Sequence, residues 1–169
     1  GFVGRLSHEK APDRFVALAK QFPDVRFELF GDGPEMDVLA KSQPDNVTFH
    51  GHQTNMDDVW SQIDLLIIPS RFEGLPMAAL EAMIRGIPVL ATSVGNLPQL
   101  IDHQVNGYLA NSESDSETAL VLEQHLSSWM SLTSEQRDSL KSNAIETVKN
   151  QYSPQAVVPQ LLEIYQLDR

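Results

Sequence analysis

The segment "LLIIPSRFEGLPMAALEAM", residues 65–83, joins an apolar run to a helical run through a short polar loop. Its first part, "LLIIP" (65–69), lacks polar alternation, which is typical of a strand buried on both faces of a parallel sheet. Pro76 suits the first turn of a helix, and the apolar residues that follow predict a helix through Met83. Strand, loop and helix in this order form the repeating unit of an α/β fold.

The same alternation continues on both sides of this segment. Further strand-like runs are "FVGRL" (2–6), "VRFELF" (25–30), "VTFH" (47–50) and "IPVLAT" (87–92). Helices are predicted over 12–22 and near 116–131, 134–150 and 154–167, with an exposed loop over 111–116. We therefore predict an α/β fold, a Rossmann-like doubly wound parallel sheet with extra C-terminal helices.

Length, composition and charge restrict the class of protein. The 169 residues, 41% apolar and 21% charged, are typical of one soluble domain over 1–169. The chain has no cysteine, which excludes disulfides and thiolate metal sites and fits a reducing compartment. A net charge of −11 repels polyanions, so nucleic acid is not an expected partner.

Two features that the sequence lacks indicate where the protein is located. No apolar run approaches the roughly 20 residues that span a bilayer, and no secretory signal opens the sequence, so a cytoplasmic protein is expected.

The chain begins inside a strand-like run, "GFVGRL" (1–6), without a polar lead-in. We therefore expect a fragment whose true start lies upstream.

In doubly wound sheets, ligands bind beyond the carboxyl ends of the strands. This rule selects five segments for inspection: Gly4–Lys10, Gly31–Pro34, His50–Asn55, Ser70–Met77 and Ser93–Pro98. In the first, Arg5 and Lys10 could hold a diphosphate, although two basic residues alone are more often a solvated surface pair. No Walker loop is present, so ATP hydrolysis of that type is not expected.

The second segment contains a glycine-rich turn directly after a strand. Gly31, Gly33 and Pro34 resemble the start of a dinucleotide-binding fingerprint, but Met36 stands where the third glycine belongs. Half a fingerprint is a weak signal. An ordinary glycine turn into a helix started by proline explains the spacing better.

Two glutamates flank the start of the helix that follows "LLIIP". Free backbone N–H groups at the helix mouth, together with the helix dipole, predict an anion site there, made by Gly74, Leu75, Pro76 and Met77. Glu81 lies about 8 Å along the helix among apolar neighbours, where an unpaired carboxylate would be costly. The vicinal hydroxyls of a ribose would supply donors to Glu81, and an ion pair with Arg85 is the alternative.

Two other kinds of chemistry have less support. Two carboxylates could cleave a glycosidic bond, but one on a helix and one at its mouth beside an anion site suits binding better. His50 and His52 follow a strand near the place where a base could stack. They lack further ligands at metal spacing, so no metal site is expected.

With these segments in hand, the chain resembles the C-terminal, nucleotide-sugar-binding domain of the retaining group 1 (family 4) glycosyltransferases, which have the GT-B fold of two Rossmann domains. The resemblance rests on an ordered set of segments: "VGRLSHEK", "FELFGDGP", "VTFHGH", "DLLIIPSRFEGLPMAALEAMIRGIPVLAT", "GNLPQLI", "NGYLA" and "YSPQAVVPQLLEIY". Two positions depart from the family pattern. Ala11 replaces a usual glycine, and Gln99 stands where a glutamate is common.

The resemblance implies a role for each candidate residue. Arg5 and Lys10, with Glu73, would be the catalytic group, because the two cations bind the donor diphosphate and Glu73 holds the transferred sugar. The ribose hydroxyls would contact Glu81. Residues bordering the nucleotide and the distal phosphate would be Gly4, Gly31, Gly33, Pro34, His52, Gly74, Leu75, Pro76 and Met77. No metal or other cofactor is expected beyond the donor substrate, a UDP-, GDP- or ADP-sugar.

The implied function is transfer of a sugar with retention from a nucleotide-diphosphate sugar to a sugar or lipid-linked acceptor, in cell-surface polysaccharide or glycolipid synthesis. An N-terminal domain absent from this chain would bind the acceptor and make any peripheral membrane contact, at the inner face of the membrane. The chain alone is expected to be inactive. A nucleotide-sugar epimerase and a non-catalytic nucleotide-sugar-binding module remain as alternatives.

Overall fold

The computed structural model describes the backbone of residues 1–165 and the side chains of residues 1–162. Six short strands form two three-stranded parallel sheets, ordered β1-β2-β3 and β4-β5-β6. The strands are β1 (Phe2–Val3), β2 (Phe27–Phe30), β3 (Val47–Gly51), β4 (Leu66–Ile68), β5 (Val89–Thr92) and β6 (Gly107–Ala110).

Hydrogen bonds at Gly1 join the two sheets. The Gly1 nitrogen donates to the Leu65 carbonyl at 2.8 Å, and the Ile67 N–H donates to the Gly1 carbonyl at 2.8 Å. These bonds place β1 beside β4, so the six strands follow the spatial order 3-2-1-4-5-6. That is the order of a Rossmann sheet, whose direction of winding reverses between β1 and β4.

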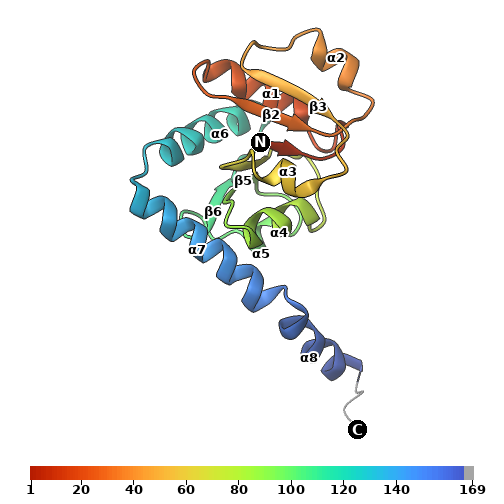
Figure 1. Cartoon of the computed structure of the whole chain (residues 1–169), viewed down its shortest axis with the longest axis vertical. Coiled ribbons are helices and arrows are strands. Elements are labelled where there is room, and N and C mark those ends of the chain that lie inside the picture. Colours follow the sequence, from red (N-terminus) through yellow and green to blue (C-terminus); the bar gives the residue numbers. More distant parts are fainter. Residues whose placement is uncertain (166–169) are drawn as a thin grey trace.

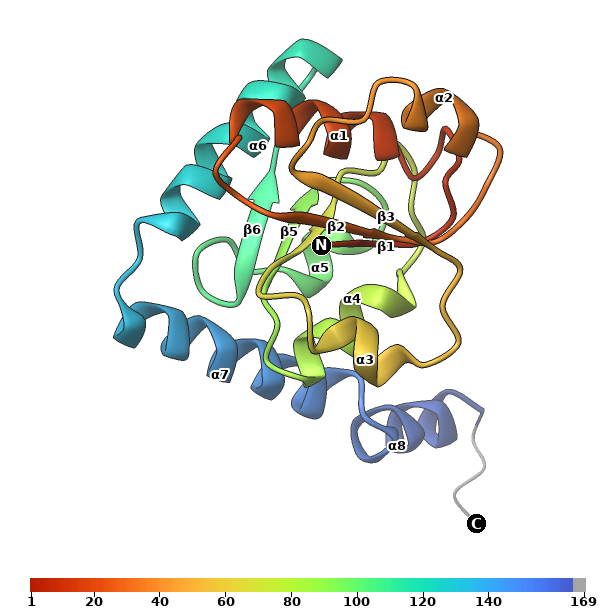
Figure 2. The ribbon, with the colours of Figure 1, turned by 45° about the horizontal axis from the view of Figure 1, so that its top comes forward.

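Helices cover both faces of the strands, as Figure 2 shows. They are α1 (Pro12–Gln21), α2 (Met36–Ala40), α3 (Met56–Trp60), α4 (Met77–Ile84), α5 (Leu97–Leu100), α6 (Asp115–Met130), α7 (Ser134–Gln151) and α8 (Pro154–Tyr165). Helices α1 and α6 lie together on one face, whereas α3 and α4 lie on the other, where α7 packs against α4. The predicted doubly wound α/β architecture is confirmed.

Alternate residues along the strands supply two separate cores. In β4, Ile67 belongs to the apolar cluster under α1 and α6, and its neighbours Leu66 and Ile68 belong to the cluster under α3 and α4. In β5, Leu90 belongs to the cluster under α1 and α6, and Val89 belongs to the cluster under α3 and α4. Because side chains of a strand alternate between faces, these strands need apolar residues at every position.

The predicted boundaries need several corrections. The first strand ends at Val3 rather than at residue 6, since the chain leaves the sheet at Gly4. β6 was not predicted as a strand. The expected loop 111–116 is shorter, because α6 begins at Asp115, with Ser114 as its N-cap. Of the helix predicted near 154–167, the last two residues lie outside the described backbone.

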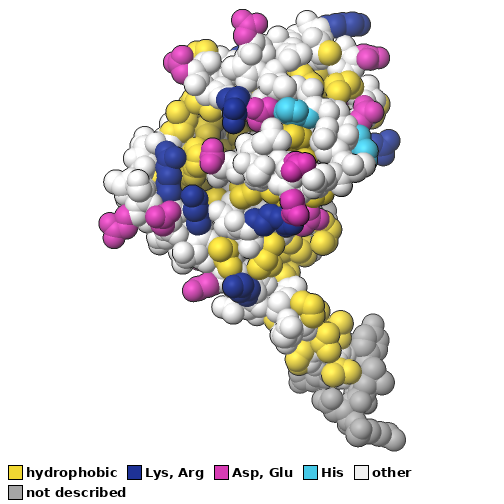
Figure 3. Space-filling view, viewed as in Figure 1, with side chains coloured by type: hydrophobic (Ala, Val, Ile, Leu, Met, Phe, Trp, Pro, Cys, Tyr) yellow, Lys and Arg dark blue, Asp and Glu magenta, His cyan; other side chains and the backbone are white. Residues whose placement is uncertain are grey.

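The C-terminal helix extends away from the body of the domain. Figure 1 shows α8 continuing beyond the end of α7, and Figure 3 shows apolar side chains gathered on it. Val158, Leu161 and Leu162 are exposed. This helix therefore presents apolar side chains to solvent. Within the described residues, no helix is both long enough and apolar enough to cross a membrane.

Candidate functional site

A first pocket lies at the carboxyl ends of β1, β2 and β3. It has a volume of about 420 Å³ and combines backbone with polar and apolar side chains. Its lining residues include four predicted site residues, Gly4, Arg5, Gly31 and His52. Arg5 is exposed and makes no ion pair within the described residues. This cation is therefore free to meet an anionic ligand.

The glycines beside this pocket allow two loops to lie in contact. A Cβ atom added at Gly31 would lie 1.8 Å from the Gly4 carbonyl oxygen, and one at Gly33 would lie 2.4 Å from the Leu6 oxygen. The Leu6 N–H donates to the Asp32 carbonyl at 2.9 Å. Gly33 does not line this pocket. The close contact of the two loops therefore explains why both positions are glycine, an explanation that the dinucleotide-fingerprint interpretation did not include.

A second, smaller pocket of about 140 Å³ adjoins the first one. Both pockets are lined by Val3 and Gly4. The second is also lined by predicted site residues from three places in the chain, namely Lys10, Glu73, Pro76 and Met77. Arg5 and Lys10 therefore line different pockets that meet at the end of β1.

Lys10 and Glu73 form the polar centre of the second pocket. The Lys10 ammonium donates to both carboxylate oxygens of Glu73, each at 2.7 Å. The Glu73 side chain is only 4% exposed, whereas that of Lys10 is 35% exposed. An ammonium has three N–H donors, so one remains for a ligand. The pairing compensates the burial of the carboxylate.

Ser70 lines the second pocket, although the sequence analysis assigned it no role of its own. Its hydroxyl donates to Glu73 Oε1 at 2.8 Å, and the residue is 1% exposed. The Ser70 carbonyl accepts from the Thr92 hydroxyl at 2.6 Å. Ser70 directly follows the buried strand β4 and its proline, a position that could have drawn attention to it.

The mouth of α4 has the geometry of an anion site. The helix begins at Met77 with Pro76 as its N-cap, and no side chain caps it. The first N–H groups of a helix lack intrahelical acceptors, and the helix dipole adds positive potential there. Met77 is 64% exposed and lines the second pocket beside Lys10 and Glu73. The Gly74 carbonyl accepts from the Asn96 N–H at 3.0 Å.

Glu81 lies one turn deeper in α4 and lines neither pocket. Its Oε2 accepts from the indole N–H of Trp60 at 3.3 Å. The alternative ion pair with Arg85 is wrong, because Arg85 donates to the Glu81 backbone carbonyl at 3.0 Å and to Asp57 at 3.0 Å. The Glu81 carboxylate thus keeps acceptor capacity.

The two histidines at the end of β3 differ in their surroundings. The His50 Nε2 lies 2.6 Å from Glu28 Oε2, and its ring stacks on Phe30 with centroids 4.3 Å apart. His52 is exposed and lines the first pocket. Only His52 is therefore placed to meet a ligand in that pocket.

The fold and these two joined pockets define the class of protein. It is a Rossmann-like domain with cations, a helix mouth and two carboxylates at the switch point of the sheet. The family model described as "Glycosyl transferases group 1" matches residues 1–147. The chain belongs to this family.

Two curated relatives illustrate the match. The O-antigen biosynthesis glycosyltransferase WbnH of Escherichia coli is 34% identical over 116 residues, which are 68% of this chain and 33% of that protein. The D-inositol 3-phosphate glycosyltransferase of Mycobacterium sp. (strain KMS) is 35% identical over 141 residues, 75% of this chain and 31% of that protein. The chain thus spans about a third of the length of these relatives.

Solved structures support the fold. The C-terminal domain of the group 1 glycosyl transferase LpcC from Francisella tularensis matches 90% of this chain and 85% of its own chain, with 24% identity and a TM-score of 0.74. Anabaena Alr3699/HepE in complex with UDP-glucose matches 98% of this chain and 48% of its own, with 23% identity and a TM-score of 0.78. The chain corresponds to the C-terminal half of GT-B glycosyltransferases.

Proposed function

We propose that this chain binds the donor of a retaining glycosyltransferase, a nucleotide-diphosphate sugar. The observation that carries the proposal is the pair of joined pockets at the switch point of the sheet. One pocket offers Arg5, and the other offers Lys10 beside the mouth of α4. A diphosphate lying across their junction at Gly4 would meet positive groups from two elements, the loop between β1 and α1 and the start of α4.

The same groups suit the chemistry of the transfer. Breaking the bond between sugar and phosphate leaves negative charge on the departing diphosphate. The guanidinium of Arg5, the ammonium of Lys10 and the first N–H groups of α4 are held in place before that charge develops, so they stabilise it without reorganisation. Glu73 would accept hydrogen bonds from hydroxyls of the transferred sugar, and Glu81 would accept them from the ribose.

The complete reaction needs more than this domain, in our proposal. The matched region makes up only about a third of these relatives, and a second Rossmann domain would bring the acceptor to the donor site. The exposed apolar face of α8 would pack against that domain. We expect the chain alone to bind donor without transferring the sugar.

The biological role follows from the relatives. Similar proteins are named for O-antigen biosynthesis and lipopolysaccharide core biosynthesis, and one comes from a cps region. We extend this to synthesis of a cell-surface polysaccharide or glycolipid on the cytoplasmic side of the membrane. Membership of the group 1 family favours this role over the epimerase alternative.

A thermal-shift screen tests the proposal. We expect one of UDP, GDP or ADP to raise the unfolding temperature of the chain, and the corresponding monophosphate to raise it much less, because the cations and the helix mouth bind the diphosphate. Inorganic diphosphate serves as the control for charge alone. Equal shifts for all ligands, or none, would contradict a donor site.

A further inference from the structure

The loop 69–73, which carries Glu73, is held by groups outside the two donor pockets. Its second residue, Ser70, is tied to β5 through Thr92, and Ser70 in turn donates to Glu73. The position of the Glu73 carboxylate therefore depends on the position of the loop backbone.

Arg14 of α1 holds the start of this loop. Its Nη1 donates to the Pro69 carbonyl at 3.0 Å and lies 3.5 Å from the Ser70 carbonyl, and its Nη2 pairs with Asp115. The Arg14 side chain is 13% exposed although α1 lies at the surface. Its guanidinium thus links α1, the end of β4 and the first residue of α6.

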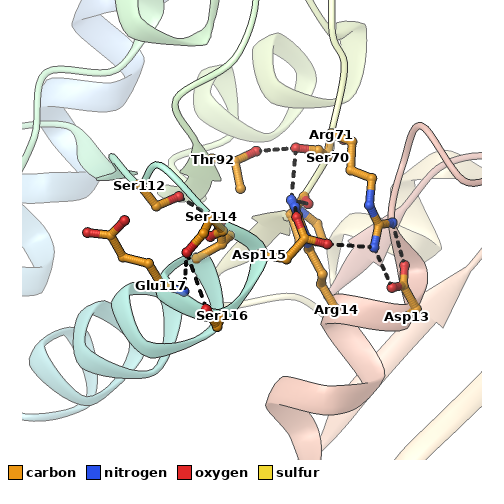
Figure 4. A network of polar contacts seen from close by, with 12 residues as sticks. Asp13, Arg14, Ser70, Arg71, Thr92, Ser112, Ser114, Asp115, Ser116 and Glu117 are labelled. Carbon is orange, nitrogen blue, oxygen red and sulfur yellow. Dashed lines mark hydrogen bonds and ion pairs between the residues drawn. The ribbon is translucent and has the colours of Figure 1, made fainter.

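Arg71 holds the middle of the loop. Its guanidinium forms a two-point contact with Asp13 at 2.8 and 2.7 Å and also reaches Asp115 at 3.5 Å, as Figure 4 shows. The Arg71 N–H donates to the Glu9 carbonyl at 2.8 Å. Side chain and backbone of Arg71 thus attach the loop to the segment that carries Lys10.

The charges of this cluster balance. The arginine hydrogen bonds lower the pKa of Asp13, through Arg71, and the pKa of Asp115, through Arg14, so both carboxylates stay ionised at neutral pH. Asp115 is 70% exposed, and ion pairs with such a group contribute little to global stability. The cluster therefore acts mainly on local geometry, where planar guanidinium groups fix direction as well as distance.

We propose that Arg14 and Arg71 are positioning residues that hold the 69–73 loop, and with it Glu73, in the geometry that receives the donor sugar. The inference rests on the proposed function for the identity of the ligand. It concerns neither the diphosphate nor the ribose, because both arginines lie outside the two donor pockets. Loss of either guanidinium should weaken recognition of the sugar and spare that of the nucleotide.

The first experiment needs no ligand. Arg14→Met and Arg71→Met keep the side-chain stem and remove the guanidinium, and Arg137→Met is the matched control. Arg137 also donates to a carbonyl, that of Met130, but it lies on α7. We expect the Phe72 amide, which donates to Glu9, and the Asn96 amide, which donates to Gly74, to exchange hydrogen at least tenfold faster in the first two variants only.

Calorimetry with UDP and UDP-glucose then tests the role in sugar binding. We expect the preference for UDP-glucose over UDP to fall at least fivefold in Arg14→Met and Arg71→Met, with the affinity for UDP changed less than twofold. Arg14→Lys should show a preference for UDP-glucose between those of the wild type and Arg14→Met, because lysine keeps the positive charge but lacks the planar guanidinium group.

The outcomes separate the two proposals. Unchanged hydrogen exchange would show that the arginines do not hold the loop. Faster exchange with an unchanged preference for UDP-glucose, or an equal loss of affinity for both ligands, would refute the positioning role. If the thermal-shift screen selects GDP or ADP, that diphosphate and its glucose ester replace UDP and UDP-glucose. A wild-type chain that binds none of the three diphosphates would contradict the proposed function, and the sugar-binding role with it, while the exchange data still decide whether the loop is held.

Discussion

Lys10 and Glu73 show how one contact can serve both stability and binding. The nearly buried Glu73 carboxylate receives two hydrogen bonds from Lys10 and a third from Ser70. Removing Lys10 would leave this carboxylate without its charged partner, which destabilises the folded state. Substitutions of Lys10 therefore need a check of folding before a loss of binding is assigned to the site.

Glu81 offers a cleaner test at the scale of one residue, because its carboxylate is bound only weakly by Trp60. If Glu81 accepts from the ribose hydroxyls, the wild-type chain should bind UDP about tenfold more tightly than 2′-deoxy-UDP. In Glu81→Ala, calorimetry should give nearly equal affinities for the two ligands. Glu123→Ala, another half-buried glutamate on a helix, should keep the preference. A preference that survives in Glu81→Ala would remove Glu81 from the ribose site.

At the level of secondary-structure elements, the site is formed by loops that contact one another beyond the carboxyl ends of the strands. The loop after β1 contacts the loop after β2 at two glycines, with backbone hydrogen bonds in both directions. The Leu6 N–H donates to Asp32, and the Glu35 N–H donates to Leu6. Glycine is required because these backbones approach closer than any side chain allows.

The variant Gly31→Ala tests whether this close contact between the two loops is needed for stability. Gly31 has a φ of +139°, and an added Cβ would overlap the Gly4 carbonyl. We expect the free energy of unfolding in urea to fall by more than about 2 kcal/mol. Gly74→Ala is the control, since a Cβ there meets nothing within 4 Å, and it should change stability by less than about 0.5 kcal/mol. Equal stability of Gly31→Ala and wild type would show that the close approach is not needed.

The sequence was sufficient for the strand–loop–helix order, because runs such as Leu65–Ile68 are apolar at every position and are followed by loop and cap signals. It was not sufficient for β6. There, Gly107 weakens the strand pattern, and a Cβ at that position would lie 2.5 Å from the Val89 carbonyl. The need for this glycine is visible only once β5 and β6 are paired.

The same limit applies to the site. Position at the carboxyl ends of strands predicted which segments matter, and four of the predicted residues line the first pocket. It could not predict partners, because the atoms that meet are far apart in the chain. Lys10 and Glu73 are 63 positions apart, and Trp60 and Glu81 are 21 apart. The alternative Glu81–Arg85 ion pair is wrong because the Arg85 guanidinium pairs instead with Asp57, which lies on α3.

At the scale of the whole molecule, the domain presents two kinds of surface. Its pockets gather positive groups at the carboxyl end of the sheet, although the chain carries a net charge of −11. Its last described helix carries exposed apolar side chains away from the body of the domain. Both features fit the proposed donor-binding half of a two-domain transferase.

Calorimetry with the nucleoside diphosphate chosen by the thermal-shift screen measures whether Arg5 and Lys10 bind the donor diphosphate. It compares the wild type, Arg5→Ala and the double variant Arg5→Ala, Lys10→Ala. Arg5 is exposed, so its variant should keep the wild-type circular dichroism spectrum, and the same spectrum decides whether the double variant is folded. We expect at least tenfold weaker binding in Arg5→Ala and no measurable binding in the folded double variant. Wild-type affinity in both variants would show that the two cations do not bind the diphosphate.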